Sequence, residues 1–228
     1  MKPVDPPARL PAPPRELGRL GAALGWLAGA QGAWPPHPPA LRRAVDIGVG
    51  GLPAGVAAAD ALADAGADLL TLEGPAASTA ALVTLCVLLD LEPVVAIGTS
   101  AGPDWSARVV AVRDALPAAR AALGDPERLV DDPVLGHATG LLAQSAVRRT
   151  PVVLGTSPLL AAAALAADRI APGARAWWHA GSQSPATAVR KAYAELELDP
   201  LLDLGLTAPG SAALAADLLV SAIALTAD

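Results

Sequence analysis

Aromatic residues are almost missing from this sequence, which has no Phe, one Tyr and five Trp among its 228 residues. Charged residues are also scarce at 17%, whereas hydrophobic residues make up 53% of the chain. A chain with this much apolar surface does not stay disordered, and its length suffices for one sizeable core. That core must be built from Ala, Leu and Val in closely packed elements, because few large rings are present to fill space.

Positive charge is in deficit as well. The chain holds 16 Lys and Arg against 22 Asp and Glu, which gives a formal net charge of −6 at pH 7. Nucleic acids bind surfaces whose cations displace condensed counterions, so this balance argues against a nucleic-acid partner.

Cysteine occurs once, as Cys86, so no disulfide can form within the chain. A single cysteine is typical of a protein that works in a reducing cytosol. Cys86 lies in the apolar run 82–89, whereas a nucleophilic thiolate needs a partly exposed, electropositive setting. We therefore expect Cys86 to be a buried, inert thiol.

Long uninterrupted hydrophobic runs are missing too. The uncharged stretch 150–167 contains Pro151, Gly155 and Pro158 and predicts a strand, a turn and a helix rather than a membrane span. The N-terminal segment lacks the apolar core of a signal peptide. We expect a cytoplasmic protein with no membrane partner.

Three regions follow one another along the chain. Residues 1–14 contain six prolines and predict a flexible tail. Residues 15–40 predict an N-terminal helix over 16–31 and a stiff connector at WPPHPP. Residues 41–228 predict a single α/β domain, because short apolar runs alternate with helical stretches.

The alternation predicts a three-layer α/β fold with a mostly parallel sheet of about five strands, helices on both faces and an N-terminal helical appendage. The expected strands are 68–73, 93–98, 150–155, 175–179 and 201–205, with a weaker one at 44–49. The expected helices are 53–65, 78–90, 104–123, 133–148, 158–168, 185–196 and 211–224.

Individual residues give more detail about the ends and interiors of several of these helices. Ser78, Ser157, Ser184 and Ser211 are expected N-caps, and Pro158 and Pro185 are expected at first helical positions. Pro117 should kink or divide its helix. The helices 78–90 and 211–224 carry few charges, so we expect the first in the core and the second in the core or against another subunit.

Small and hydroxylated residues follow the expected strands. In a parallel sheet these carboxyl ends meet at one edge, where bare backbone N–H groups, hydroxyls and helix N-termini suit a phosphate or another anion. Strand–helix loops also use Gly, Ser and Thr simply for turns and caps, and both interpretations stay open. The candidate nucleotide- or phosphate-binding residues are Ser78, Thr79, Gly98, Thr99, Ser100, Gly155, Thr156, Gly181, Ser182, Gly210 and Ser211.

Catalytic and metal-binding signatures are weak. The three histidines share no ligand spacing with one another or with Cys86, so we expect no metal site, and no cofactor motif is present. Glu73 and Asp203 each lie near the end of an expected strand, where a carboxylate either does acid–base chemistry or has a structural role. Glu73 is our candidate for catalysis.

Five segments, taken in order, resemble the nicotinate-nucleotide:dimethylbenzimidazole phosphoribosyltransferase family of cobalamin biosynthesis. They are PPRELGRLGAALGWLAGAQG (13–32), AADALADAGADLLTLEG (58–74), IGTSAGPDWSARVVAVRDAL (97–116), RRTPVVLGTSPLLAAAALAADRIAPGARAWWHAGS (148–182) and LDPLLDLGL (198–206). The resemblance implies a three-layer α/β fold and a homodimer. It also implies a reaction in which dimethylbenzimidazole displaces nicotinate from nicotinate mononucleotide and gives α-ribazole phosphate.

The sequence departs from the family where the resemblance places the chemistry. The family's general-base Glu lies in a Gly-Glu-Gly loop, but residues 207–211 read TAPGS and contain no carboxylate. The family's glycine-rich phosphate loop is GPAAST at 74–79, and its Ala-Gly-His-Arg-Ser motif is AGSQS at 180–184. A family segment that carries a Gly-Asp-His-Gly signature is absent between Pro39 and Val56.

These departures leave more than one function open. The resemblance implies a phosphoribosyltransferase whose activity is weak or lost, with nicotinate mononucleotide or a benzimidazole-like base as its ligand. Loss of a general base alone costs about 10²–10⁴-fold in rate. The alternative is a non-catalytic relative that acts as a binding or partner module, and a small α/β protein unrelated to cobalamin is the third interpretation.

Overall fold

Five short strands form one fully parallel sheet in the computed structural model, which describes residues 2–10, 15–75, 77–98, 102, 104–205 and 209–226. The order across the sheet is β1-β2-β3-β4-β5, the same as the order along the chain. The prediction of an α/β fold with a parallel sheet of about five strands is confirmed. The strands are β1 (Arg42–Asp46), β2 (Leu69–Glu73), β3 (Val152–Leu154), β4 (Trp178–Ser182) and β5 (Pro200–Leu202).

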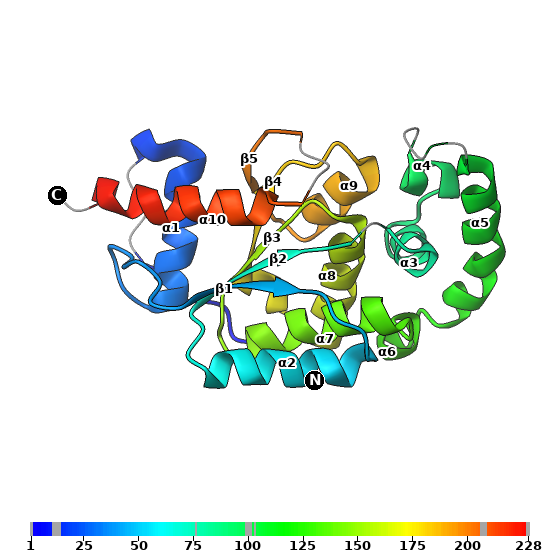
Figure 1. Ribbon diagram of the computed structural model, residues 1–228, viewed down its shortest axis with the longest axis horizontal. Coiled ribbons are helices and arrows are strands. Elements are labelled where there is room, and N and C mark those ends of the chain that lie inside the picture. Colours follow the sequence, from blue (N-terminus) through cyan, green and yellow to red (C-terminus); the bar gives the residue numbers. More distant parts are fainter. Residues whose placement is uncertain are drawn as a thin grey trace.

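Helices cover both faces of the sheet. Crossovers between parallel strands are right-handed, so strands that are added in one direction place all connecting helices on the same face. The opposite face must therefore be covered by the ends of the chain, and α1 (Gly18–Gln31) and α10 (Ser211–Ala222) do this (Figure 1). The connecting helices are α2 (Gly51–Asp64), α3 (Thr79–Leu89), α4 (Pro93–Ile97), α5 (Trp105–Ala121), α6 (Pro126–Leu129), α7 (Pro133–Val147), α8 (Pro158–Ile170) and α9 (Thr187–Glu195).

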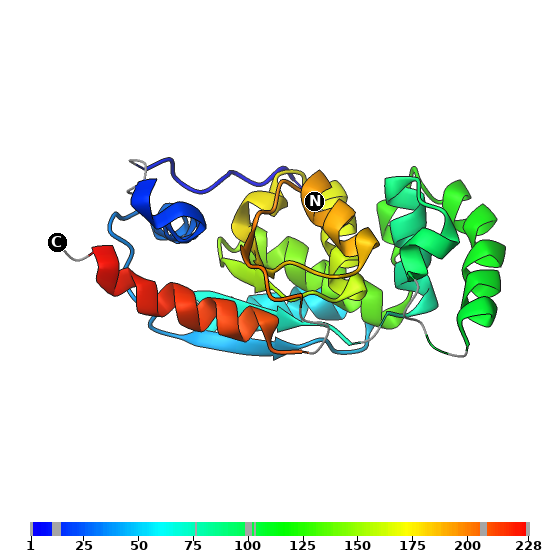
Figure 2. The same ribbon diagram turned by 90° about the horizontal axis from the view of Figure 1, so that it is seen from above.

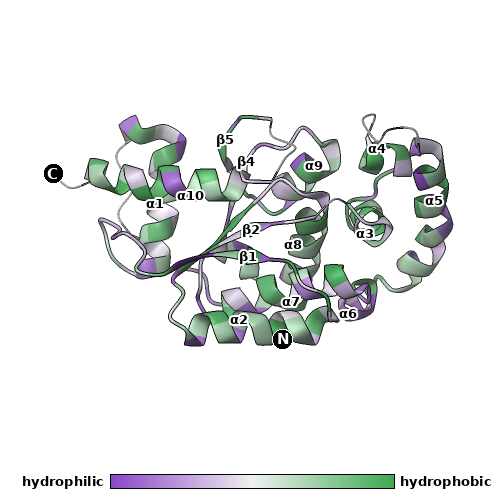
Figure 3. Cartoon of the chain, in the orientation of Figure 1, coloured by the Kyte–Doolittle hydropathy of each residue, from purple (hydrophilic) through white to green (hydrophobic). Residues whose placement is uncertain are grey.

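Side chains alternate between two cores. Leu69 and Val153 pack with α1 and α10, whereas Leu70 and Leu154 pack with the larger core of the connecting helices. The alternation follows from the two-residue period of a strand. Helix α8 is buried along most of its length, and Figure 3 shows mostly hydrophobic residues along it. The expectation of an Ala- and Leu-rich core is met.

Three connecting helices are exceptions to this covering, because α3, α4 and α5 stand beyond one end of the sheet rather than against its face (Figure 2). They belong to the long connection between β2 and β3. Helix α3 packs on α8 and α5, and α4 packs on α9, so the group faces the carboxyl ends of the strands.

Several expected elements are corrected by the structure. The segment 93–98 is not a strand but the helix α4, because Pro93 cannot donate to a ladder and has the fixed φ that suits a first helical position. Residues 174–177 form a 3₁₀ turn, so β4 begins at Trp178. Strand β1 lies earlier than 44–49, and β5 ends at Leu202.

Helix ends agree in part with the expected chemistry. Ser78 caps α3 by accepting the Ala81 N–H, and Ser157 caps α8 by accepting the Leu159 N–H, with Pro158 at the first position. Ser184 and Ser211 are not N-caps, because the N-cap residue is Ala186 in α9 and Gly210 in α10. The expectation that Pro185 begins a helix is also wrong, since α9 begins at Thr187.

Two expectations about helix interiors can be compared with the structure. Helix α5 runs without a break through Pro117, so this proline does not divide it. Helix α10 buries one face, but Leu214 and Leu218 on its other face are 47% and 40% exposed. Its burial is therefore one-sided within this chain.

The N-terminal residues 2–10 run along the turn after α8 and then along α1. The Val4 N–H donates to the Pro172 carbonyl at 2.8 Å, and the Ala8 N–H donates to the Gly29 carbonyl at 3.1 Å. Gly29 is required by this approach, because a Cβ there would lie 2.7 Å from the Ala8 oxygen. The flexibility of the tail stays a prediction.

Within the described part of the chain, no helix combines the length and the apolar character that crossing a membrane requires.

Candidate functional site

A cavity of about 870 Å³ opens at the carboxyl edge of the sheet. It lies between the loops after β2, β3 and β4 on one side and α4 on the other. The strand order never reverses, so this sheet has no switch-point crevice of the usual doubly wound kind. The group of helices beyond the sheet supplies the missing wall. The lining residues are Glu73, Gly74, Pro75, Ala77, Leu82, Val94, Val95, Ala96, Ile97, Gly98, Arg108, Thr156, Ser157, Pro158, Ser184, Pro185, Ala186, Thr187 and Pro209.

The register of the sheet brings distant loops together here. Leu72 pairs with Leu154, and Leu154 pairs with Ala180. The next residues, Glu73, Gly155 and Gly181, therefore reach the same edge. This arrangement explains why loops that are separated by about 80 residues surround one cavity.

Most of the cavity wall is apolar. Helix α4 contributes Val94, Val95 and Ile97, three prolines come from the surrounding loops, and a fourth stands at the first position of α8. Proline has no backbone N–H, so each of these positions lacks a donor for an anion. Such a lining suits an apolar ring, with a few polar groups to fix its orientation.

Glu73 supplies the only carboxylate among the described lining residues, and one of its oxygens is hydrogen-bonded to the protein's own backbone. Its Oε1 accepts the Ala212 N–H at 2.6 Å, in the first turn of α10, where the helix dipole favours a negative charge. A Cβ at Gly155 would overlap Oε2 and would lie 2.9 Å from the carboxyl carbon. The carboxylate therefore lies between α10 and Gly155.

Tyr193 on α9 helps to fix the position of Gly155, against which Glu73 lies. Its hydroxyl donates to the Gly155 carbonyl. Burial, and then the negative charge of Glu73, raise the pKa of Tyr193 far above its ordinary value of 10.0. The tyrosine is therefore neutral at pH 7, and it holds Gly155 in place rather than exchanging protons.

The serines at the cavity are occupied by the loops themselves. Ser157 Oγ donates to the Pro75 carbonyl at 2.8 Å and accepts the Leu159 N–H at 3.1 Å. Ser184 Oγ donates to the Thr156 carbonyl at 3.3 Å. These hydroxyls tie the loops after β2, β3 and β4 together, which is the turn-and-cap role that the sequence left open.

Arg108 is the only cationic side chain among the described residues that line the cavity. It is half-buried in the first turns of α5, and its Nη2 donates to the Ala77 carbonyl at 3.2 Å. Nearby, the Trp105 indole N–H donates to the Gly98 carbonyl at 2.6 Å. Both contacts hold the start of α5 against the loops that enclose the cavity.

The structure separates the candidate residues into three groups. Glu73, Gly98 and Thr156 line the cavity, whereas Thr99 and Ser100 lie outside the described residues. The others do not line it, and their part in binding stays a prediction. Among these, Ser78 caps α3, Gly210 and Thr79 are exposed, and the rest are buried beneath the loops: Gly155, Gly181, Ser182 and Ser211.

Sequence reasoning missed Arg108 and the apolar wall of α4. The wall was missed because residues 93–98 were assigned to a strand. Arg108 could have been found as the first basic residue after the Gly98 loop, one turn into an expected helix. Asp203, the other candidate carboxylate, is exposed and does not line the cavity.

Other reactive groups lie elsewhere in the fold. Burial raises the pKa of the Cys86 thiol to about 11, so it is a neutral, inert group, as expected. Over the ranges that the structure describes, no three His, Cys, Asp or Glu side chains gather as metal ligands would.

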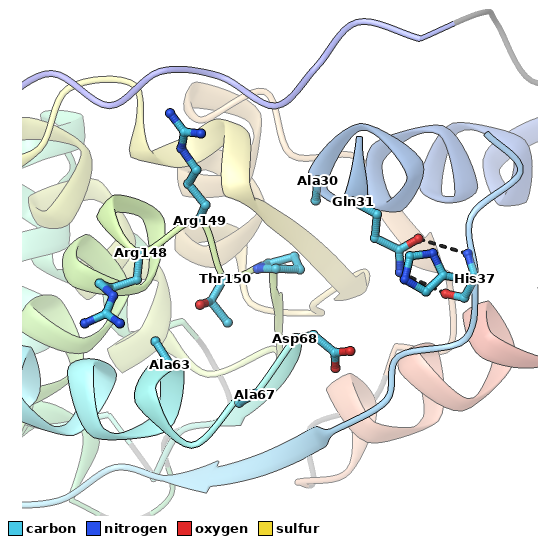
Figure 4. Close-up of a pocket in the computed structure, with 11 residues that line it drawn as sticks. Ala30, Gln31, His37, Ala63, Ala67, Asp68, Arg148, Arg149 and Thr150 are labelled. Carbon is cyan, nitrogen blue, oxygen red and sulfur yellow. Dashed lines mark hydrogen bonds between the residues drawn. The ribbon is translucent and has the colours of Figure 1, made fainter. Parts of the chain in front are cut away.

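A second, smaller cavity of about 350 Å³ lies at the opposite, amino edge of the sheet (Figure 4). Several of its polar groups are engaged by the chain itself. Asp68 accepts the backbone N–H groups of Ala40 and Leu41, and the Gln31 amide bonds both backbone groups of His37. Arg148 pairs with Asp60 and Asp64 at 3.0 and 2.5 Å. This cavity is a junction of the connector, α2 and α7.

Comparisons with known proteins agree with this architecture. A family model described as "Phosphoribosyltransferase" matches residues 38–228. The nicotinate-nucleotide–dimethylbenzimidazole phosphoribosyltransferase of Mycobacterium avium (strain 104) is 45% identical over 161 residues, which are 67% of this chain and 46% of that protein. The protein of the same name from Mycobacterium tuberculosis is 44% identical over 159 residues, or 66% of this chain and 44% of that one.

Solved structures give the same result. The crystal structure of CobT from Thermus thermophilus matches with a TM-score of 0.76 and 25% identity, covering 96% of this chain and 92% of that one. The chain thus has the fold of a phosphoribosyltransferase. It belongs to the nicotinate-nucleotide:dimethylbenzimidazole phosphoribosyltransferase family, and it spans about half the length of the curated relatives that it matches.

Proposed function

We propose that this chain binds nicotinate mononucleotide or a benzimidazole-like base in the carboxyl-edge cavity, and that its phosphoribosyl transfer between them is weak or absent. Family membership supports the choice of ligands. The cavity supports binding, because its volume of about 870 Å³ and its apolar α4 wall suit a flat ring.

The contact between Glu73 and Ala212 carries the second half of the proposal. In the transfer, the unprotonated benzimidazole nitrogen bonds to the ribose carbon while nicotinate leaves, and the N–H proton on the other ring nitrogen passes to a base. Such a base must reach within hydrogen-bonding distance of the proton. Glu73 Oε1 is bound to the α10 N-terminus and Oε2 lies beside Gly155, so the only carboxylate of the described lining is anchored to the protein itself.

The test is incubation of the protein at high concentration with nicotinate mononucleotide and dimethylbenzimidazole, with chromatographic detection of α-ribazole phosphate. Calorimetric titration with each compound runs beside it. We expect measurable binding and a turnover at least about 10²-fold below that of a full-length relative, because a missing general base costs about that much. Turnover equal to that of the relative, or no binding of either compound, would refute the proposal.

Glu73→Gln tests whether any residual turnover depends on this carboxylate. The amide oxygen can still accept the Ala212 N–H, so the fold should hold, but the side chain can no longer take a proton. If residual turnover depends on Glu73, the variant loses it. If the wild-type protein shows none, the chain is a binding module, which is the alternative function.

A partner role is supported by a separate observation. Leu214 and Leu218 on α10 and Leu225 after it are 47%, 40% and 61% exposed, on the side of α10 that faces away from its own sheet. We propose that this face joins two copies of the chain in a cytoplasmic homodimer, as the family resemblance implies. Sedimentation of wild type and of Leu214→Glu tests this proposal by measuring the oligomeric state. A dimer that forms through this face should dissociate in the variant.

A further inference from the structure

Arg108 differs from the other arginines around the two cavities in having no acidic partner. Arg148 at the amino-edge cavity pairs with Asp60 and Asp64. For Arg108 the structure shows one hydrogen bond, to the Ala77 carbonyl, and no ion pair with any residue in the described part of the chain. Its guanidinium has five N–H donors, and the hydrogen bond to Ala77 uses only one of them at the cavity.

The surroundings make this charge significant. The chain carries a net charge of −6, so its overall field repels an anionic ligand unless a local cation attracts it. Backbone donors are sparse at the cavity, because Pro75, Pro158, Pro185 and Pro209 all line it. The hydroxyls of Ser157 and Ser184 already donate to backbone carbonyls. Arg108 therefore supplies the only positive charge on the described cavity wall that can attract an anion.

We infer that Arg108 is the anion-binding residue of the carboxyl-edge cavity and that it holds a phosphate monoester, as carried by a mononucleotide. Its planar guanidinium matches two phosphate oxygens, and the hydrogen bond to Ala77 limits its rotation. The base of the mononucleotide would then pack against the apolar α4 wall of the same cavity. This inference rests on the proposed function and assigns the phosphate to a residue.

The test compares wild type, Arg108→Ala, Arg108→Lys and Arg113→Ala by calorimetric titration with ribose 5-phosphate and with inorganic phosphate. Arg113 is the matched control, since it lies on the same helix, pairs with Asp114 and does not line the cavity. We expect Arg108→Ala to weaken phosphate binding about 10- to 100-fold, the cost of losing one charged hydrogen-bonding group. Arg108→Lys should lose less, and Arg113→Ala should bind as wild type does.

Dimethylbenzimidazole separates this inference from the proposed function. It has no phosphate, so its affinity should be the same in wild type and in Arg108→Ala. If wild type binds dimethylbenzimidazole but not the phosphate compounds, or if Arg108→Ala binds them normally, the role of Arg108 is wrong and base binding stands. If phosphate binding depends on Arg108 but neither dimethylbenzimidazole nor the mononucleotide binds, the proposed function fails instead. Thermal unfolding of each variant checks that the fold is retained.

Discussion

The two cavities at opposite edges of the sheet differ in what their charged groups do. At the amino edge, Arg148 and Asp68 are satisfied by Asp60, Asp64 and the backbone of the connector. At the carboxyl edge, Glu73 is bound to the protein's own backbone, whereas Arg108 has no acidic partner within the described chain. We propose that the unpaired charge, rather than the presence of a cavity, distinguishes a ligand site from a structural junction.

Gly155→Ala should break the carboxyl-edge arrangement. The new Cβ would overlap Glu73 Oε2 and lie 3.1 Å from the Leu72 carbonyl oxygen, so Glu73 must leave Ala212. We expect the free energy of unfolding to fall by about 2–3 kcal/mol, from overpacking and a lost charged hydrogen bond. Urea unfolding measures it.

The control for that change is Gly124→Ala, because a Cβ at Gly124 would meet no atom within 4 Å. A double-mutant cycle with Glu73→Ala sharpens the comparison. Once the carboxylate is removed, Gly155→Ala should lower the free energy of unfolding by less than it does in wild type. Strictly additive effects of the two substitutions would show that Glu73 does not lie against Gly155.

Asp68→Ala should break the amino-edge junction without touching the ligand site. The Ala40 and Leu41 N–H groups would lose their carboxylate partners at 2.6 and 3.0 Å. We expect a stability loss of about 1–2 kcal/mol, since both donors can partly turn to water. Chemical denaturation measures this loss, with the exposed Asp131→Ala as a control.

Ligand affinities of Asp68→Ala should match those of wild type. A loss of phosphate or dimethylbenzimidazole binding in this variant would mean that the amino-edge cavity is the ligand site, and it would reverse the comparison.

The alternation of strands and helices was readable from the sequence, because buried parallel strands are short apolar runs and their helices carry caps. The segment 93–98 was wrongly assigned to a strand, because the apolar side chains of PVVAI are typical of a buried strand. Its leading proline instead favours the first position of a helix. The sequence could also place Glu73 at the end of a strand. Its contact with Ala212, which is 139 residues away, could not be read, because it depends on where α10 returns to the sheet.

Acid should destabilise the protein through histidines that are buried in the neutral form. Burial lowers the pKa of His179, which packs against Trp26, below its ordinary value of 6.5. The unfolded chain takes up a proton at about pH 6.5 and the folded chain does not, so stability is full above this pH and falls below it. The slope contributed by His179 cannot exceed about 1.4 kcal/mol per pH unit.

Thermal unfolding at pH 7.5, 6.5 and 5.5 measures this dependence. His179→Gln should flatten the loss between pH 6.5 and 5.5, while the exposed His37→Gln, at the amino-edge cavity, should leave it unchanged. An equal slope in all three proteins would contradict the assignment.

A crystal structure of the chain grown with nicotinate mononucleotide would test most directly whether the unpaired charge defines the site. We predict that the nucleotide lies in the carboxyl-edge cavity with its phosphate on Arg108, while Glu73 keeps its contact with the Ala212 N–H. A nucleotide in the amino-edge cavity, or a phosphate held away from Arg108 with Glu73 turned toward the ligand, would contradict this view.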